Sequence, residues 1–164
     1  MENAQSLRLC KQRRRGKSGC SKIRQSDFQK NRSFLPATNY FNDPFLQVTN
    51  GIAACATPHG PLVTKSEMLA DSHYRADRGI NCFQAGRCRL PNSYLYDKEI
   101  IPRVKKAIEA SGRFTQTSWA EGQRRWVWLK GCVRKQSEAE ELERLVRALD
   151  DVEAVVNDLT VQER

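Results

Sequence analysis

Apolar positions recur with a clear period only in the second half of the chain, after Asp97. Side chains three and four residues apart predict a helix that Asp97 caps and Gly112 ends, with an apolar face of Ile100, Ile101, Val104, Ala107 and Ile108. A second helix opens with the capping box Ser137–Glu140 and has an apolar face of Leu142, Leu145, Val146 and Leu149. Because each helix has one apolar face, each must pack against another layer.

The same half of the chain contains three stretches with strand character, over residues 113–120, 124–133 and 152–161. Residues 121–123 are predicted to form the turn between the first two. Successive side chains of a strand point to opposite sides, so in the middle stretch the aliphatic residues share one face. Trp126, Trp128, Lys130 and Cys132 share the other face. The element order predicts an α+β fold, a two-layer αββαβ sandwich over residues 96–162, with both helices on one face of a three-stranded sheet.

Residues 39–95 are rich in Pro, Gly, Asn and Thr, and they predict an irregular extension that packs on this domain. One short helix is expected over residues 64–78, opened by a capping box of Thr64 and Glu67 and ended by Gly79. The extension has scattered aromatic residues and no core of its own. We therefore expect it to lie over the open face of the sheet and to cover the tryptophans.

The charge of the chain is concentrated at its start. The 164 residues include 28 basic and 19 acidic ones, for a net charge of +9. Ten basic and two acidic residues lie before Pro36, so this stretch carries +8 and the remainder only +1. Few large apolar residues accompany them, and residues 1–38 are predicted to form a disordered basic tail. Binding of nucleic acid or another polyanion through this tail is an alternative function, although the nearly neutral remainder disfavours nucleic acid as the main partner.

Several classes of function lack support in the sequence. No apolar run approaches the ~20 residues of a membrane-spanning helix, and no export signal is recognisable. We find no Ser/His/Asp set, metal motif or Gly-rich phosphate loop, so we expect neither an enzyme nor a cofactor.

Four of the six cysteines lie where the chain is expected to fold: Cys55, Cys82, Cys88 and Cys132. An even number favours two disulfides and an oxidising compartment. The preferred pairing is Cys82–Cys88, which closes a short loop, with Cys55–Cys132, which would fasten the extension to the sheet. Two alternatives stay open: a zinc site with His59 or His73 as the fourth ligand, and free thiols in a reducing cytoplasm.

The pattern from Asp97 to Val161 resembles a BON domain, a small module of bacterial osmotic-stress and secretin-associated envelope proteins. The strand Val127-Trp-Leu-Lys-Gly131-Cys-Val133 is similar to the family's Val-x-Leu-x-Gly-x-Val, and the closing Val152–Leu159 is similar to its last strand. Asp151 and the pair Arg124–Arg125 stand where the family often has glycine, at positions that favour turns. The resemblance implies the αββαβ fold, a non-enzymatic role in the periplasm or at the outer membrane, and binding to phospholipid or to an envelope protein.

The candidate surface for a lipid or protein partner comprises Arg124, Trp126, Trp128 and Lys130, because aromatic side chains beside cations suit a membrane interface. A periplasmic location is the preferred prediction and a cytoplasmic one the alternative. The sequence does not indicate an oligomeric state.

Overall fold

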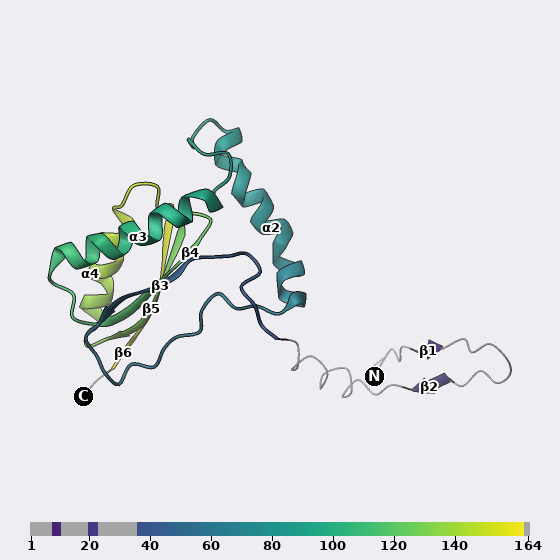
Figure 1. The fold of residues 1–164 in the computed structure, drawn as a ribbon, viewed down its shortest axis with the longest axis horizontal. Coiled ribbons are helices and arrows are strands. Elements are labelled where there is room, and N and C mark those ends of the chain that lie inside the picture. The colour runs from purple at the N-terminus through teal and green to yellow at the C-terminus, as the bar shows by residue number, and fades with distance from the viewer. Residues whose placement is uncertain (1–7, 11–19, 23–35, 163–164) are drawn as a thin grey trace, which may run out of the picture. The chain divides into compact units, whose positions relative to one another are not determined.

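The structure is a computed structural model that describes residues 8–10, 20–22 and 36–162, and the chain divides into two units. The unit that ends at Pro36 contains two short antiparallel strands, β1 (Arg8–Cys10) and β2 (Cys20–Lys22). Residues 1–7, 11–19 and 23–35 of the tail that is predicted to be disordered lie outside the described residues. All other elements belong to the second unit (Figure 1).

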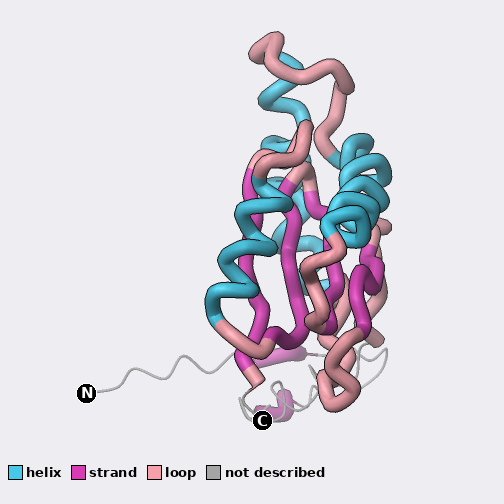
Figure 2. The backbone as a smooth tube through the Cα atoms, turned by 90° about the vertical axis from the view of Figure 1, so that its left-hand side faces the viewer, coloured by secondary structure: helices cyan, strands magenta, loops and turns pink. Residues whose placement is uncertain are grey.

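A four-stranded sheet forms one layer of the second unit. Its strands are, in spatial order, β3 (Phe45–Asn50), β4 (Thr117–Gln123), β5 (Trp126–Val133) and β6 (Ala154–Val161). The β3–β4 and β4–β5 pairs are antiparallel and the β5–β6 pair is parallel. Two helices, α3 (Tyr94–Ser111) and α4 (Gln136–Arg147), pack along the sheet (Figure 2). The predicted α+β class is confirmed.

The two faces of β5 divide as the alternating pattern predicts. Val127, Leu129 and Val133 are fully buried. Val127 and Leu129 meet the apolar faces of both helices in one core, to which α3 and α4 contribute Ile100, Ile101, Val104, Ile108, Leu142 and Val146. The opposite face of β5 carries Trp126, Trp128, Lys130 and Cys132, and we call this side of the sheet the tryptophan face.

The sheet has one strand more than the sequence pattern predicts. Strand β3 belongs to the extension that was expected to be irregular, and it pairs with β4 in a register that sets Phe45 opposite Glu121. The prediction of three strands was therefore wrong. In a three-stranded sheet β4 would be an edge strand with unpaired backbone groups, and β3 supplies hydrogen-bond partners for these groups.

Helix α2 (Lys65–Gln84) starts as predicted, since the side chain of Thr64 accepts the N–H of Glu67 and the Glu67 carboxylate accepts the N–H of Thr64. It ends six residues later than predicted. Gly79 is not a helix end but a contact point, where an added Cβ would lie 2.7 Å from Oδ1 of Asn92. Figure 1 shows α2 standing apart from α3 and α4.

Other helix boundaries also differ from the prediction. Helix α3 begins at Tyr94, so Asp97 lies in its first turn and is not its cap, whereas Gly112 ends the helix with φ 62° as expected. Helix α4 begins at Gln136, after Lys135, and without the predicted capping box. No helix of the described residues is long and apolar enough to span a membrane.

Candidate functional site

The turn between β4 and β5 is strained. Arg124 and Arg125 form this two-residue turn with φ angles of 57° and 69°. Asn and Gly are the usual residues at such positions, since a side chain with φ above zero costs about 1 kcal/mol. The predicted turn at residues 121–123 was therefore wrong, because an Arg-Arg pair does not signal this geometry in a sequence.

Asp97 holds the strained turn in place. Its two carboxylate oxygens accept the backbone N–H groups of Arg124 and Arg125, each at 2.7 Å. The residue is 2% exposed. Burial raises the pKa of Asp97 to about 6, against the two hydrogen bonds, which lower this pKa. A pocket of about 90 Å³ adjoins it, lined by Phe41, Asn42, Asp43, Pro44, Tyr94, Asp97 and Lys98.

Arginine and aromatic side chains gather around this turn. We name as the arginine–aromatic cluster the residues Tyr74, Arg78, Tyr94, Arg124 and Trp126. The guanidinium of Arg78 lies 4.3 Å from the ring centre of Trp126 and 5.6 Å from that of Tyr74. The guanidinium of Arg124 lies 5.1 Å from the ring centre of Tyr94. These are distances at which a cation and an aromatic ring attract each other.

Helix α2 reaches the cluster because two of its arginines bind the sheet and its flanking loop. Arg75 is 5% exposed and pairs with Asp43 at 2.5 Å and with Asp71. One turn later, Arg78 donates to the backbone carbonyls of Gln123 and Arg124. These bonds fix the helix against the β4–β5 turn, and they place Arg78 over Trp126.

Neither cation of the cluster forms a salt bridge with a residue that the structure describes, whereas Arg75 forms two. Arg124 uses Nε to donate to the carbonyl of Arg75. Burial lowers the pKa of the Arg124 guanidinium. The nearby carboxylates of Asp43 and Asp97 raise this pKa, and the positive charges of Arg75 and Arg78 lower it. The cluster therefore concentrates positive charge in a half-buried place.

The four candidate surface residues do not form one continuous open patch. Arg124 and Trp126 belong to the cluster, and the Trp128 ring lies 5.9 Å from that of Trp126. Lys130 instead pairs with the Glu121 carboxylate at 2.7 Å and donates to the carbonyl of His59. Both tryptophans are half-buried, so the tryptophan face is partly covered.

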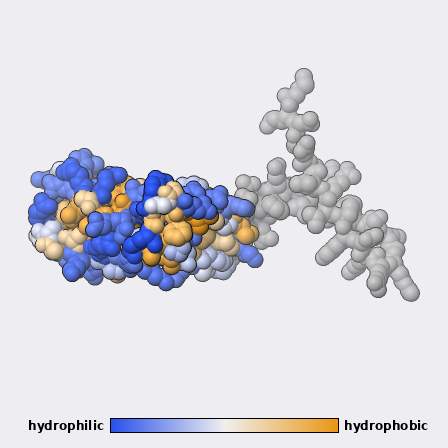
Figure 3. Space-filling view, turned by 90° about the horizontal axis from the view of Figure 1, so that it is seen from above, coloured by the Kyte–Doolittle hydropathy of each residue, from blue (hydrophilic) through white to orange (hydrophobic). Residues whose placement is uncertain are grey.

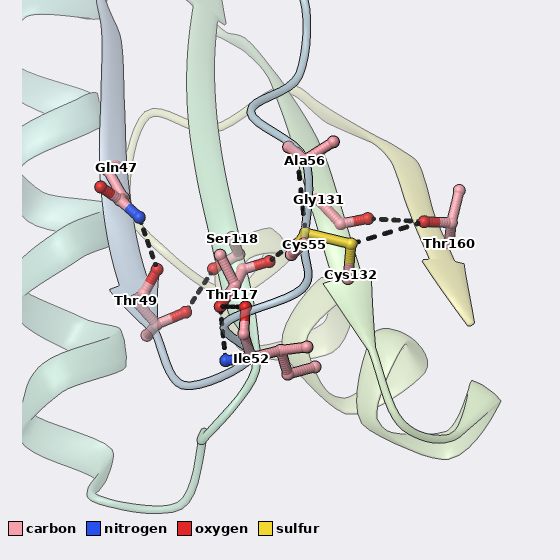
Figure 4. The surroundings of a disulfide bond; sticks show 10 residues. All are labelled: Gln47, Thr49, Ile52, Cys55, Ala56, Thr117, Ser118, Gly131, Cys132 and Thr160. Carbon is pink, nitrogen blue, oxygen red and sulfur yellow. Dashed lines mark hydrogen bonds between the residues drawn. A yellow bond between two sulfur atoms is a disulfide. The ribbon is translucent and has the colours of Figure 1, made fainter. Parts of the chain in front are cut away.

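A segment of the extension, residues 51–63, crosses the tryptophan face, and we call it the strap. Cys55 in the strap forms a disulfide with Cys132 of β5 (Figure 4). The Ile52 N–H donates to the Thr117 hydroxyl at 2.7 Å, and this hydroxyl donates to the Ile52 carbonyl at 3.0 Å. Figure 4 shows these contacts on the same side of β4 and β5. The strap is thus fastened to the sheet by one disulfide and two hydrogen bonds.

The second disulfide, Cys82–Cys88, lies where α2 ends. Both predicted disulfides are therefore present, and these four cysteines have no free thiol to bind zinc. Among the described residues, no group of three or more metal-ligating side chains comes together. Figure 3 shows a mainly hydrophilic surface on which apolar residues form small separate patches.

These features define a small α+β module that displays cations and aromatic rings and is stabilised by disulfides. Residues 96–163, from the start of α3 through β6, match the family model of the BON domain. The C-terminal part of the chain thus matches the BON domain family, as the resemblance implies. That family is an envelope-associated, phospholipid-binding type of module and is generally non-catalytic. No curated protein and no solved structure matches the chain.

Two residues that define the site are not apparent from the sequence. Arg78 lies on a helix with only a weak apolar face, and its contact with Trp126 depends on where α2 crosses the hairpin. Asp97 has the sequence context of a helix cap. Its hydrogen bonds to the β4–β5 turn become visible only in the folded structure. No local sequence signal therefore identifies Arg78 or Asp97 as part of the site.

Proposed function

We propose that this protein is a non-enzymatic binding module of the bacterial envelope that contacts anionic phospholipid. The observation that carries the proposal is the arginine–aromatic cluster, of which Arg124 and Trp126 lie within the residues that match the BON domain. Indole rings favour the headgroup level of a membrane, and guanidinium groups favour its phosphates. Arg124 and Trp126 supply this combination at one end of the sheet.

The two disulfides support a periplasmic location for this activity, because structural disulfides persist in oxidising compartments. The BON match of residues 96–163 favours the same setting. A role in the envelope stress response agrees with both observations.

Sedimentation of the full chain with vesicles tests the proposal. We expect binding to vesicles of phosphatidylglycerol and phosphatidylcholine, much weaker binding to phosphatidylcholine alone, and a decrease with added salt. Equal affinity for both vesicle types, or binding to neither, would overturn the proposal and leave an envelope protein as the partner.

The basic tail needs its own control, since it attracts any polyanion. A full-length variant with Arg13→Gln, Arg14→Gln and Arg15→Gln removes three positive charges there. The proposal expects this variant to retain most of its binding to anionic vesicles. Loss of binding in this variant, together with unchanged binding after substitution of Trp126 by Ala, would assign the activity to the tail instead.

A further inference from the structure

Two enclosed hydrogen-bond donors of the arginine–aromatic cluster have no acceptor. Nε of Arg78 and Nε1 of Trp126 are both buried, and neither has a hydrogen-bond partner among the described residues. A buried donor without an acceptor costs about 1–3 kcal/mol, so native proteins rarely keep one. Here two such donors belong to side chains in contact, with the Arg78 guanidinium 4.3 Å from the Trp126 ring centre.

The two cations of the cluster also lack a salt bridge, although the carboxylates of Asp43 and Asp97 lie near Arg124. Arg78 and Arg124 are half-buried, and within the described part of the chain no carboxylate forms a salt bridge with either. Desolvated cations normally have an anionic partner, because removing an ion from water is costly. The cations without a salt bridge and the donors without an acceptor therefore lie together in the arginine–aromatic cluster.

The backbone conformation of Arg124 adds a third observation. This residue has φ 57°, although Asn or Gly would adopt that angle with less strain. The buried Asp97 carboxylate holds the turn in this shape at 2.7 Å. Strain that the surrounding structure maintains is typical of binding sites, and here it positions a guanidinium beside Arg78.

We propose that Arg78, Arg124 and Trp126 form a binding site for a phosphate group. A phosphate offers several acceptor oxygens and up to two negative charges, and guanidinium groups bind it in bidentate fashion. It would balance the two cations and accept hydrogen bonds from α2, the β4–β5 turn and β5. Two sources supply this chemistry: a lipid headgroup, as the proposed function requires, and free inorganic phosphate.

The indole N–H resonance of Trp126 in a ¹⁵N NMR spectrum of the full chain reports directly on this site. We expect inorganic phosphate, titrated at constant ionic strength, to shift that resonance, while chloride does not. Arg78→Gln and Arg124→Asn should each weaken binding about tenfold, the loss expected for one charge-assisted hydrogen bond. Asn tolerates the positive φ of position 124, so that variant keeps the turn.

Arg134→Gln is the matched control, because it removes the same charge from an exposed residue that follows the far end of β5. Unchanged phosphate binding in both cluster variants, or an equal loss in Arg134→Gln, overturns the site. Absence of a shift with both phosphate and anionic vesicles overturns it as well.

Vesicles of phosphatidylglycerol and phosphatidylcholine separate the two sources of phosphate. A response of Trp126 to vesicles but not to inorganic phosphate supports the site and assigns it to a headgroup. A response to inorganic phosphate without vesicle binding supports the site and overturns the proposed function. Vesicle binding that neither cluster variant weakens overturns the site and leaves the proposed function standing.

Discussion

The carboxylate of Asp97 accepts the backbone N–H of Arg124 at 2.7 Å, although 27 residues separate the two in the chain. A second oxygen of the same carboxylate accepts the N–H of Arg125. The first turn of α3 thereby determines the shape of the β4–β5 hairpin. Helix α3 is thus tied to the tip of the sheet by hydrogen bonds as well as by the apolar core.

Replacing Asp97 by Ala is expected to lower the free energy of unfolding by about 3 kcal/mol at pH 7, since two buried N–H groups lose their acceptor. Asp97→Asn keeps one acceptor oxygen and should lose roughly half as much. Urea unfolding measures both effects. Asp158→Ala, at an exposed position of β6, serves as the control. A loss below that of the control would show that the turn holds its shape without Asp97.

The raised pKa of Asp97 predicts a specific dependence of stability on pH. Its pKa is about 6 in the folded chain and 3.8 in the unfolded one, so the folded state binds the proton more tightly. Protonation therefore stabilises the fold as the pH falls from 7 to 4, by up to about 3 kcal/mol. Other carboxylates act in the opposite direction, so the quantity to measure is the difference between wild type and Asp97→Asn. We expect the wild type to gain free energy of unfolding relative to Asp97→Asn as the pH falls toward 4. A difference that does not change with pH would contradict the raised pKa of Asp97.

Gln116 is a place where the fold is expected to gain stability. The residue is 1% exposed, and neither Nε2 nor Oε1 of its amide has a hydrogen-bond partner among the described residues. Gln116→Met has a similar shape without the amide and should raise the free energy of unfolding by about 1–2 kcal/mol, with a rise in Tm. Gln116→Glu should lower the Tm strongly. Loss of stability in Gln116→Met would indicate that the amide binds an internal water.

The two disulfides should contribute unequally to stability. Cys55–Cys132 joins residues 77 positions apart, and Cys82–Cys88 joins residues 6 apart. Loop-closure entropy gives about 4.5 kcal/mol for the first and about 2.4 kcal/mol for the second. We compare the double variants Cys55→Ser with Cys132→Ser, and Cys82→Ser with Cys88→Ser, by urea unfolding. Equal losses would show that strap contacts such as Ile52 with Thr117 maintain the closed loop without the disulfide.

Much of the sandwich was predictable because its signals are local. The spacing of Ile100, Val104 and Ile108 defines the apolar face of α3, and the alternation of Val127 and Leu129 defines the apolar face of β5. Neither pattern depends on how the helix and the strand pack together. Gly112 ends α3 because its φ of 62° suits glycine. Even the departures from the family pattern were informative, since Arg124, Arg125 and Asp151 all have positive φ where glycine is usual.

Other elements depend on partners that are distant in the chain. Strand β3 has a weak pattern and forms because β4 offers an unpaired edge. The end of α2 could not be predicted, because Gly79 looks like a helix end until the approach of Asn92 is known. The cap assigned to Asp97 failed for the same reason, since its hydrogen bonds lie across the fold.

The layers of this protein, the division of β5 into two faces and the preferred pairing of its cysteines can all be inferred from local patterns along the chain. These properties follow from periodicity and parity, which are the same in any tertiary arrangement. By contrast, the salt bridge of Lys130 with Glu121 and the contact of Trp126 with Arg78 depend on tertiary packing. A charged side chain acquires its role from whatever lies within a few ångströms of it, and that neighbourhood exists only after α2, α3 and the hairpin have packed.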